Sequence, residues 1–125
     1  MMTNILVNKN TSLLEIILNR PDDGNALSLE LIEKLNDILE NYQNDLEIKL
    51  VTIRGQGDKF FIAGGDIKEL NTVRSESDID EMIKLGRRTL DTIRYYPVPV
   101  IALINGYTLG GGAELAMACD YRLAI

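Results

Sequence analysis

Residues 101–120 read IALINGYTLGGGAELAMACD, and three consecutive glycines in this stretch run directly into a segment of strong helix formers. The apolar run before them, which starts after Pro99, is rich in β-branched side chains and is typical of a buried strand. Gly110, Gly111 and Gly112 have no Cβ, so the backbone can approach a ligand closely, and the first N–H groups of the following helix lack an acceptor within it. The stretch therefore predicts a strand, a glycine turn and a helix beside a site.

Glu114 is the acid of this helical segment and follows the middle glycine by three residues. A glycine triplet by itself is more often a flexible turn between a strand and a helix. Glutamate, however, is seldom placed beside an apolar helix face unless it is paired or functional. One helical turn brings its carboxylate near the free N–H groups, a geometry that suits proton transfer beside a stabilised oxyanion. We therefore predict Glu114 as a catalytic acid/base.

A second segment, residues 60–70, has the same organisation and reads FFIAGGDIKEL. An apolar entry leads to Gly64 and Gly65, and a helix is predicted to start at Asp66. Two such turns can direct two backbone N–H groups at one oxygen atom, and the predicted donors are the amides of Ala63 and Gly111. Asp66 is interpreted as the N-cap of its own helix, since aspartate is a preferred residue there.

Composition narrows the function classes. The chain is 46% hydrophobic and 26% charged, which is typical of an ordered single domain. Because it has no histidine, Ser-His-Asp hydrolysis, Cys-His proteolysis and histidine-ligated metal sites are excluded. A net charge of −6 with interspersed signs argues against nucleic-acid binding. We expect a cytoplasmic protein with no membrane partner, because neither a membrane-length apolar run nor a signal-peptide pattern is present.

The rest of the sequence predicts alternating strands and helices. Strands are expected at about residues 4–9, 12–18 and 48–53, and a helix is expected from the N-cap Ser28 to about Tyr42. A longer helix spans about residues 76–94 and is ended by Pro97 and Pro99. This order favours parallel strands with right-handed crossovers, so that both glycine loops leave the same strand ends.

Two side-chain predictions concern the core. The apolar side chains of the longer helix recur at helical spacing and are expected to be buried: Ile79, Met82, Ile83, Leu90 and Ile93. Cys119 has no partner for an internal disulfide and is expected to be a small core residue.

FFIAGGDIKEL and INGYTLGGGAELAMACD, together with the weaker LNRPDDGNALS at residues 18–28, resemble the enoyl-CoA hydratase/isomerase, or crotonase, superfamily over nearly the whole chain. The resemblance implies an α/β fold, a crotonase-like right-handed spiral of ββα units, of which residues 1–125 form the N-terminal part of a single domain. It also implies a lyase that adds water to 2-enoyl-CoA thioesters, as in fatty acid metabolism, and stabilises an enolate in an oxyanion hole. A double-bond isomerase or a truncated, non-catalytic relative is the alternative.

The resemblance also assigns residues. Ala63 and Gly111 match the oxyanion donors, and Glu114 matches the first of two acids used by the hydratases. Coenzyme A is part of the substrate, so no separate cofactor is implied, and the full-length protein is expected to be a homotrimer or hexamer. The segments that resemble the CoA-binding ones comprise Asn25, Ala26, Leu27, Ala63, Gly64, Gly65, Asp66, Ile67 and Lys68.

Two departures from the family pattern stand out. The second glutamate of the hydratases lies C-terminal to the Glu114 segment, and the sequence ends at Ile125 before reaching it. Residues 121–125 have the pattern of an apolar strand without a polar tail, so a fragment or a shortened chain with exposed apolar surface is expected. Asp22 stands where many relatives offer a basic residue to the CoA phosphates.

Overall fold

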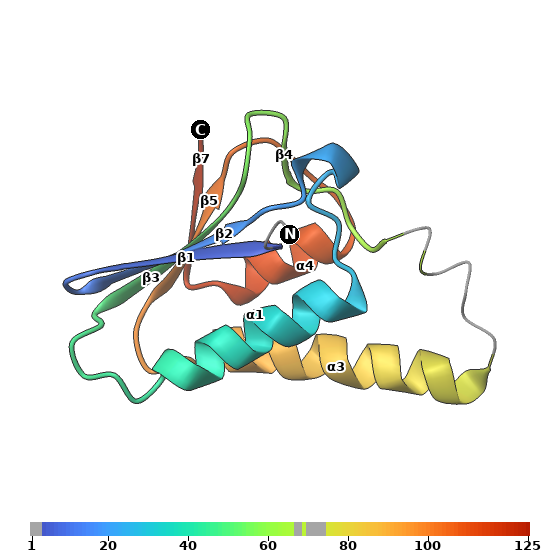
Figure 1. Cartoon of the computed structure of the whole chain (residues 1–125), viewed down its shortest axis with the longest axis horizontal. Coiled ribbons are helices and arrows are strands. Elements are labelled where there is room, and N and C mark those ends of the chain that lie inside the picture. The colour runs from blue at the N-terminus through green and yellow to red at the C-terminus, as the bar shows by residue number, and fades with distance from the viewer. Residues whose placement is uncertain (1–3, 67–68, 70–74) are drawn as a thin grey trace.

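A central five-stranded sheet with the order β1-β2-β3-β5-β7 organises the chain (Figure 1). The computed structural model describes residues 4–66, 69 and 75–125. The antiparallel hairpin of β1 and β2 is extended by three parallel strands. The strands are β1 (Ile5–Asn10), β2 (Leu13–Leu18), β3 (Leu50–Gly55), β5 (Val100–Ile104) and β7 (Tyr121–Ala124). The predicted α/β alternation and the parallel strand pairing are confirmed.

Two helices, α1 (Leu29–Tyr42) and α3 (Glu76–Arg94), lie side by side on one side of the sheet and run in the same direction (Figure 1). The predicted N-cap of α1 is confirmed, because Ser28 Oγ accepts a hydrogen bond of 3.1 Å from the Leu31 N–H. Leu31, Leu35 and Leu39 form the buried stripe of α1 and are fully enclosed. Burial of this stripe fixes α1 against the core.

The longer helix is less buried than its apolar pattern predicts. Thr89 and Ile93 are its buried residues, whereas Ile79 and Ile83 are 46% and 53% exposed. The core prediction is therefore wrong for Ile79 and Ile83, and Met82 and Leu90 are half-buried. The physical reason is that the N-terminal part of α3 extends past the start of α1, where none of the described helices or strands covers it (Figure 1).

A small parallel sheet of β4 (Phe60–Ile62) and β6 (Tyr107–Thr108) brings the two glycine segments together. Gly64 and Gly65 follow β4, while Gly110 to Gly112 follow β6 and lead into α4 (Gly111–Ala118). The Leu109 N–H extends this pairing by donating to Ile62 O at 3.0 Å. Both turns thus leave the same end of one sheet, as the sequence predicts.

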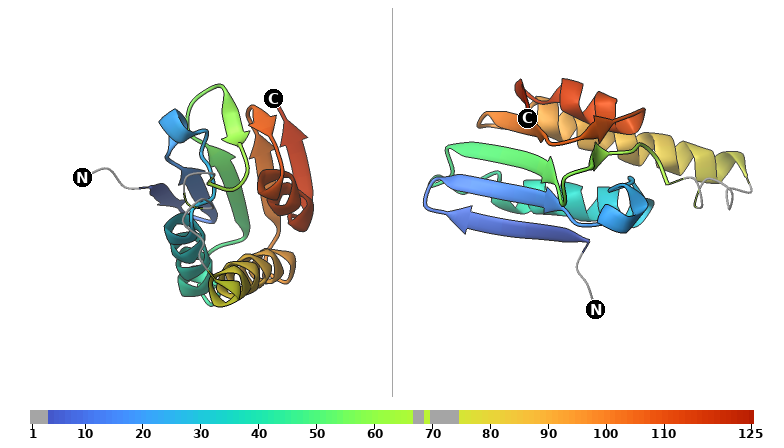
Figure 2. Two further views of the ribbon diagram at one scale, coloured as in Figure 1. Left: turned by 90° about the vertical axis from the view of Figure 1, so that its right-hand side faces the viewer. Right: turned by 90° about the horizontal axis from the view of Figure 1, so that it is seen from above.

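The hydrophobic core lies between the sheet and the helices, whereas the β7 edge of the sheet is exposed. The core joins β2, β3 and β5 to α1 and α4 and includes Cys119, which is 4% exposed, so its predicted core position is confirmed. Strand β7 lies at the sheet edge beside the C-terminus (Figure 2), where Tyr121 and Leu123 are 64% and 54% exposed. The predicted exposure of apolar surface is confirmed there. None of the helices in the described ranges is both long and apolar enough to span a membrane.

Candidate active site

A pocket of about 390 Å³ lies where the two glycine turns meet α1, α3 and α4. Its lining contains one residue from each turn, Gly65 and Gly111, together with the carboxylate of Glu114. The remaining lining is mostly apolar: Leu27, Ile32, Leu35, Met82, Ile83, Gly86, Arg87, Thr89, Leu90 and Leu115. A larger open hollow of about 600 Å³ lies near Lys59 and Tyr107 and contains none of the predicted site residues.

The second glycine turn is fixed by its own backbone. Gly110 has φ 51° and ψ −118°, a conformation that favours glycine. A Cβ on Gly112 would lie 2.5 Å from Ile62 O, so this glycine lets α4 pack directly on β4. The N–H groups of Gly112 and Glu114 donate to Leu109 O and Gly110 O at 2.9 and 3.1 Å. Within the described part of the chain, the N–H of Gly111 donates to no acceptor and borders the pocket.

The first glycine turn is paired with the loop that precedes α1. The Ala63 N–H donates to Gly24 O at 2.8 Å, and the Leu27 N–H donates to Gly64 O at 2.7 Å. The Asp66 N–H completes a short parallel bridge by donating to Leu27 O at 3.2 Å. The amide of Ala63 is therefore occupied, and its assignment as an oxyanion donor is corrected.

Gly65 takes the place predicted for Ala63. Its N–H makes no hydrogen bond in the described part of the chain, and the residue lines the pocket with Gly111 and Glu114. Pairing with the loop before α1 uses the amides of Ala63 and Asp66. The two amides between them, of Gly64 and Gly65, donate to no described acceptor, and of these two residues Gly65 lines the pocket. Both free N–H groups thus border one cavity.

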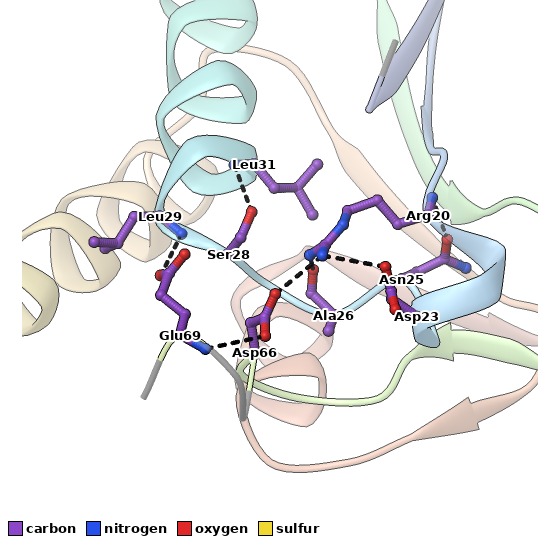
Figure 3. A network of polar contacts seen from close by, with 9 residues as sticks. All are labelled: Arg20, Asp23, Asn25, Ala26, Ser28, Leu29, Leu31, Asp66 and Glu69. Atoms are coloured by element: carbon purple, nitrogen blue, oxygen red, sulfur yellow. Dashed lines mark hydrogen bonds and ion pairs between the residues drawn. The ribbon is translucent and has the colours of Figure 1, made fainter. Parts of the chain in front are cut away.

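Arg20 connects the loop before α1 to the first glycine turn (Figure 3). Its guanidinium donates to Ala26 O at 2.7 Å and forms a 3.0 Å ion pair with Asp66, and a longer contact of 3.4 Å reaches Asp23. The side chains of Arg20 and Asp66 are only 16% and 15% exposed. Ion pairs with this degree of burial resist screening by salt, so the contact holds the first turn against the loop before α1. The sequence reasoning did not identify Arg20.

Asn25 supports the same loop from inside. It is fully buried with φ 53°. Its side-chain amide donates to Gln56 O and Phe60 O at 3.2 and 3.0 Å, while its oxygen accepts from the Arg20 N–H at 2.9 Å. A side chain enclosed in this way cannot contact a ligand, so the CoA-binding prediction for Asn25 is corrected to a loop-holding role.

The other residues predicted to bind CoA divide into three groups. Ala26 and Gly64 are buried, and their carbonyl groups accept the loop hydrogen bonds described above. Leu27 and Gly65 line the pocket. Ile67 and Lys68 lie outside the described residues.

Asp66 makes the contact expected of an N-cap. Its Oδ1 accepts a hydrogen bond of 3.3 Å from the Glu69 N–H, three residues further on. Glu69 in turn accepts from the Leu29 N–H at 2.8 Å, so this segment is also connected to the start of α1. Asp66 is therefore a structural residue that connects the first turn to Arg20 and to Glu69.

Glu114 lies in the first turn of α4, where the positive end of the helix dipole favours a carboxylate. It is exposed and forms no ion pair with the described residues. A carboxylate without a fixed partner is available to exchange protons with a ligand in the pocket. Together with the N–H groups of Gly65 and Gly111, for which the described residues offer no acceptor, this carboxylate can stabilise an oxyanion and move a proton beside it.

Sequence comparisons identify the family of the chain. Residues 8–125 match the family described as Enoyl-CoA hydratase/isomerase. The chain is 38% identical over 121 residues to a crotonyl-CoA hydratase of Syntrophomonas wolfei, covering 97% of this chain and 46% of that protein. It is 34% identical over 126 residues to a short-chain-enoyl-CoA hydratase of Clostridium acetobutylicum, covering 98% of this chain and 47% of the relative.

The structural comparison gives the same result. The crystal structure of an enoyl-CoA hydratase from Bacillus anthracis superimposes with a TM-score of 0.93 at 40% identity, covering 98% of this chain and 47% of that one. The chain belongs to the enoyl-CoA hydratase/isomerase family and has the crotonase fold. It spans slightly less than half the length of these relatives.

Proposed function

We propose that the pocket binds the thioester group of a 2-enoyl-CoA and that the protein adds water to its double bond. The observation that carries this proposal is that Gly65 and Gly111, whose N–H groups donate to no described acceptor, line one cavity together with Glu114. The thioester oxygen would accept hydrogen bonds from both amides. The names of the hydratase relatives support the same reaction class.

Hydration then proceeds through an enolate. Glu114 accepts a proton from a water molecule as the water oxygen bonds to C3 of the enoyl group, and the π electrons move through C2 onto the thioester oxygen. The two amides stabilise the negative charge there, and removal of one such donor costs about 100- to 1,000-fold in kcat. Return of this proton from Glu114 to C2 then gives the 3-hydroxyacyl-CoA and restores the carboxylate. Coenzyme A stays part of the substrate throughout.

A double-bond isomerase is the second candidate. The observation that favours it is that Glu114 is the sole carboxylate among the described residues that line the pocket. Hydration handles two protons and is shared most easily by two acids, whereas one carboxylate can take a proton from C2 of a 3-enoyl-CoA and return it to C4. The same oxyanion pair would stabilise the dienolate.

A substitution at Glu114 tests both reactions. Turnover of crotonyl-CoA is followed by the loss of enoyl thioester absorbance, and 3-butenoyl-CoA serves as the isomerase substrate. Glu114→Gln is expected to lower kcat by about 100-fold or more, while calorimetric binding of butyryl-CoA stays within about twofold.

Glu33→Gln is the matched control. It makes the same chemical change at an exposed position of α1 outside the pocket, and turnover should not change. Equal kcat values for Glu114→Gln and the unmodified chain would contradict the assignment. Absence of turnover with both substrates would contradict the proposed activity for this 125-residue chain.

A further inference from the structure

Gly86 stands at an unusual position in α3. It lies in the middle of a 19-residue helix, where glycine is the poorest helix former after proline. Its φ is not in the left-handed region that would call for glycine. A Cβ added to Gly86 would meet no described atom within 4 Å. Neither backbone conformation nor tight packing therefore accounts for this glycine, in contrast to Gly112, whose Cβ would meet Ile62 O at 2.5 Å.

The open space beside Gly86 belongs to the pocket. Met82, Gly86 and Leu90 follow one another at four-residue spacing, so they lie on one face of α3, and all three line the cavity. Gly86 thus lacks a side chain at one position of a mostly apolar wall. A larger residue there would project into the cavity between its two neighbours.

Apolar side chains dominate the wall around Gly86, although Arg87 and Thr89 also line the cavity. Leu27, Ile32, Leu35 and Leu115 face the cavity from the loop, α1 and α4. Ile83, close to Gly86 in α3, is 53% exposed although it lines the same cavity. Apolar side chains left in water at the edge of a cavity gain free energy when an apolar ligand covers them.

We propose that Gly86 determines the length of the acyl chain that the pocket accepts, and that the missing side chain admits linear acyl groups longer than that of crotonyl-CoA. This inference rests on the proposed binding of acyl-CoA thioesters. Each additional methylene that is buried tightens binding about fourfold, so longer chains bind more tightly until they meet the wall. Gly86 is therefore a specificity-determining residue and takes no part in the proton transfers.

The test uses two saturated ligands, butyryl-CoA and octanoyl-CoA, whose dissociation constants are measured by calorimetry on the whole chain. The unmodified chain is expected to bind octanoyl-CoA at least about tenfold more tightly than butyryl-CoA. Gly86→Leu should weaken octanoyl-CoA binding by at least tenfold and leave butyryl-CoA within about twofold. Lys84→Leu is the control, because it adds the same side chain to an exposed position of α3 that does not line the cavity.

Gly86→Ala separates the pocket effect from folding. Alanine is the best helix former, so this variant should melt at a higher temperature than the unmodified chain while its preference for octanoyl-CoA becomes smaller. Equal weakening of both ligands in Gly86→Leu, or no weakening of either, would overturn the inference, as would a chain that binds neither ligand. If the preference is lost in Gly86→Leu but Glu114→Gln turns over normally, the pocket inference stands and the proposed catalysis fails.

Discussion

Each glycine turn brings to the pocket a residue whose N–H has no acceptor among the described residues, Gly65 in one and Gly111 in the other, but different parts of the molecule hold the two turns in place. The Gly111 turn is local: β6, Gly110 and α4 are consecutive in the chain, and their own backbone hydrogen bonds set its geometry. The Gly65 turn depends on a remote loop, through the bridge to Leu27 and the ion pair between Arg20 and Asp66. One donor is therefore positioned by secondary structure and the other by tertiary contacts.

This difference explains which donor the sequence identifies. A local turn is visible as a pattern of neighbouring residues, so Gly111 could be assigned from three glycines and a helix. Residues 60–70 alone do not reveal that the first turn pairs with residues 24–27. This pairing gives the Ala63 N–H an acceptor, Gly24 O, whereas the Gly65 N–H has none among the described residues.

Proline substitutions that remove each N–H should produce the largest effects. Gly111 is the first residue of α4, a position where proline is tolerated, so Gly111→Pro should delete the donor while the helix is retained. We expect kcat for crotonyl-CoA hydration to fall about 100- to 1,000-fold. Gly65→Pro should give a loss of the same order if both amides bind one oxygen, and Ala63→Ser, which keeps its N–H, should not.

Alanine variants at the same positions are the controls for these two substitutions. Gly111→Ala keeps the N–H, and its Cβ would meet only the flexible end of Leu27 at 3.3 Å, so kcat should stay within about tenfold. Normal activity in Gly111→Pro would remove this amide from the site. A large loss for Gly111→Pro alone would show that the two turns do not act on one oxygen.

Removal of the Arg20 guanidinium should disturb only the first turn. Arg20→Met removes an ion pair from the Asp66 carboxylate, whose side chain is only 15% exposed, and this should lower the free energy of unfolding by about 3 kcal/mol. Urea denaturation measures this loss. In the fraction that stays folded, kcat should fall more than butyryl-CoA affinity, because the Gly65 amide is no longer held in position.

Arg88→Met is the matched control for this prediction. Arg88 forms a 2.7 Å ion pair with Glu40, but its side chain is 60% exposed, and such pairs contribute little to stability. The pKa of Glu40 is lowered by its hydrogen bond to Arg88. The pair therefore adds its small stabilisation to the fold at pH values above the pKa of Glu40 in the unfolded chain. This stabilisation is lost as the pH falls through the lower pKa of Glu40 in the folded chain. Equal destabilisation by Arg20→Met and Arg88→Met would show that the buried pair has no special role.

Much of the fold follows from the sequence because its signals are local. The N-cap Ser28, the apolar stripe of α1 and the prolines after α3 fix where helices start and stop, and the observed elements agree closely with these signals. The small sheet of β4 and β6 was not predicted, because strands this short are stable only through each other. The apolar pattern of Ile79 and Ile83 was assigned to the core, although it belongs to a helix that borders a pocket.

From the sequence, pocket residues could be predicted only where a short local motif marks them. Glu114 and Gly111 were predicted from a lone acid that follows a glycine triplet, and both line the pocket. Asn25 was assigned to ligand binding, but its amide is enclosed by backbone groups from three other segments. Such enclosure depends on contacts between residues far apart in the chain, which a motif does not encode. An asparagine at positive φ beside the turn of residues 21–23 was the available signal for a structural role.

Cys119 offers a way to measure how independent the two turns are. It lies at the end of α4, and burial raises its pKa to about 12, so at pH 8 the folded chain presents almost no thiolate. A thiol reagent should therefore label it only when α4 opens, at a rate that rises with pH up to about 8.5, the pKa of an exposed thiol. The pKa of the Cys119 thiol is higher in the folded chain than in the unfolded chain. The neutral thiol therefore makes its full contribution to the free energy of unfolding below about pH 8.5, and this contribution is lost as the pH rises toward the folded pKa.

The labelling rate should respond to the second turn and not to the first. Gly112→Ala forces a Cβ to within 2.5 Å of Ile62 O, which should loosen α4 and speed labelling by about tenfold or more. Arg20→Met should leave the rate within about twofold at low denaturant, provided that α4 opens independently of the first loop. If Arg20→Met speeds labelling as much as Gly112→Ala does, the two turns open as one cooperative unit, and the division between locally and remotely held donors is wrong.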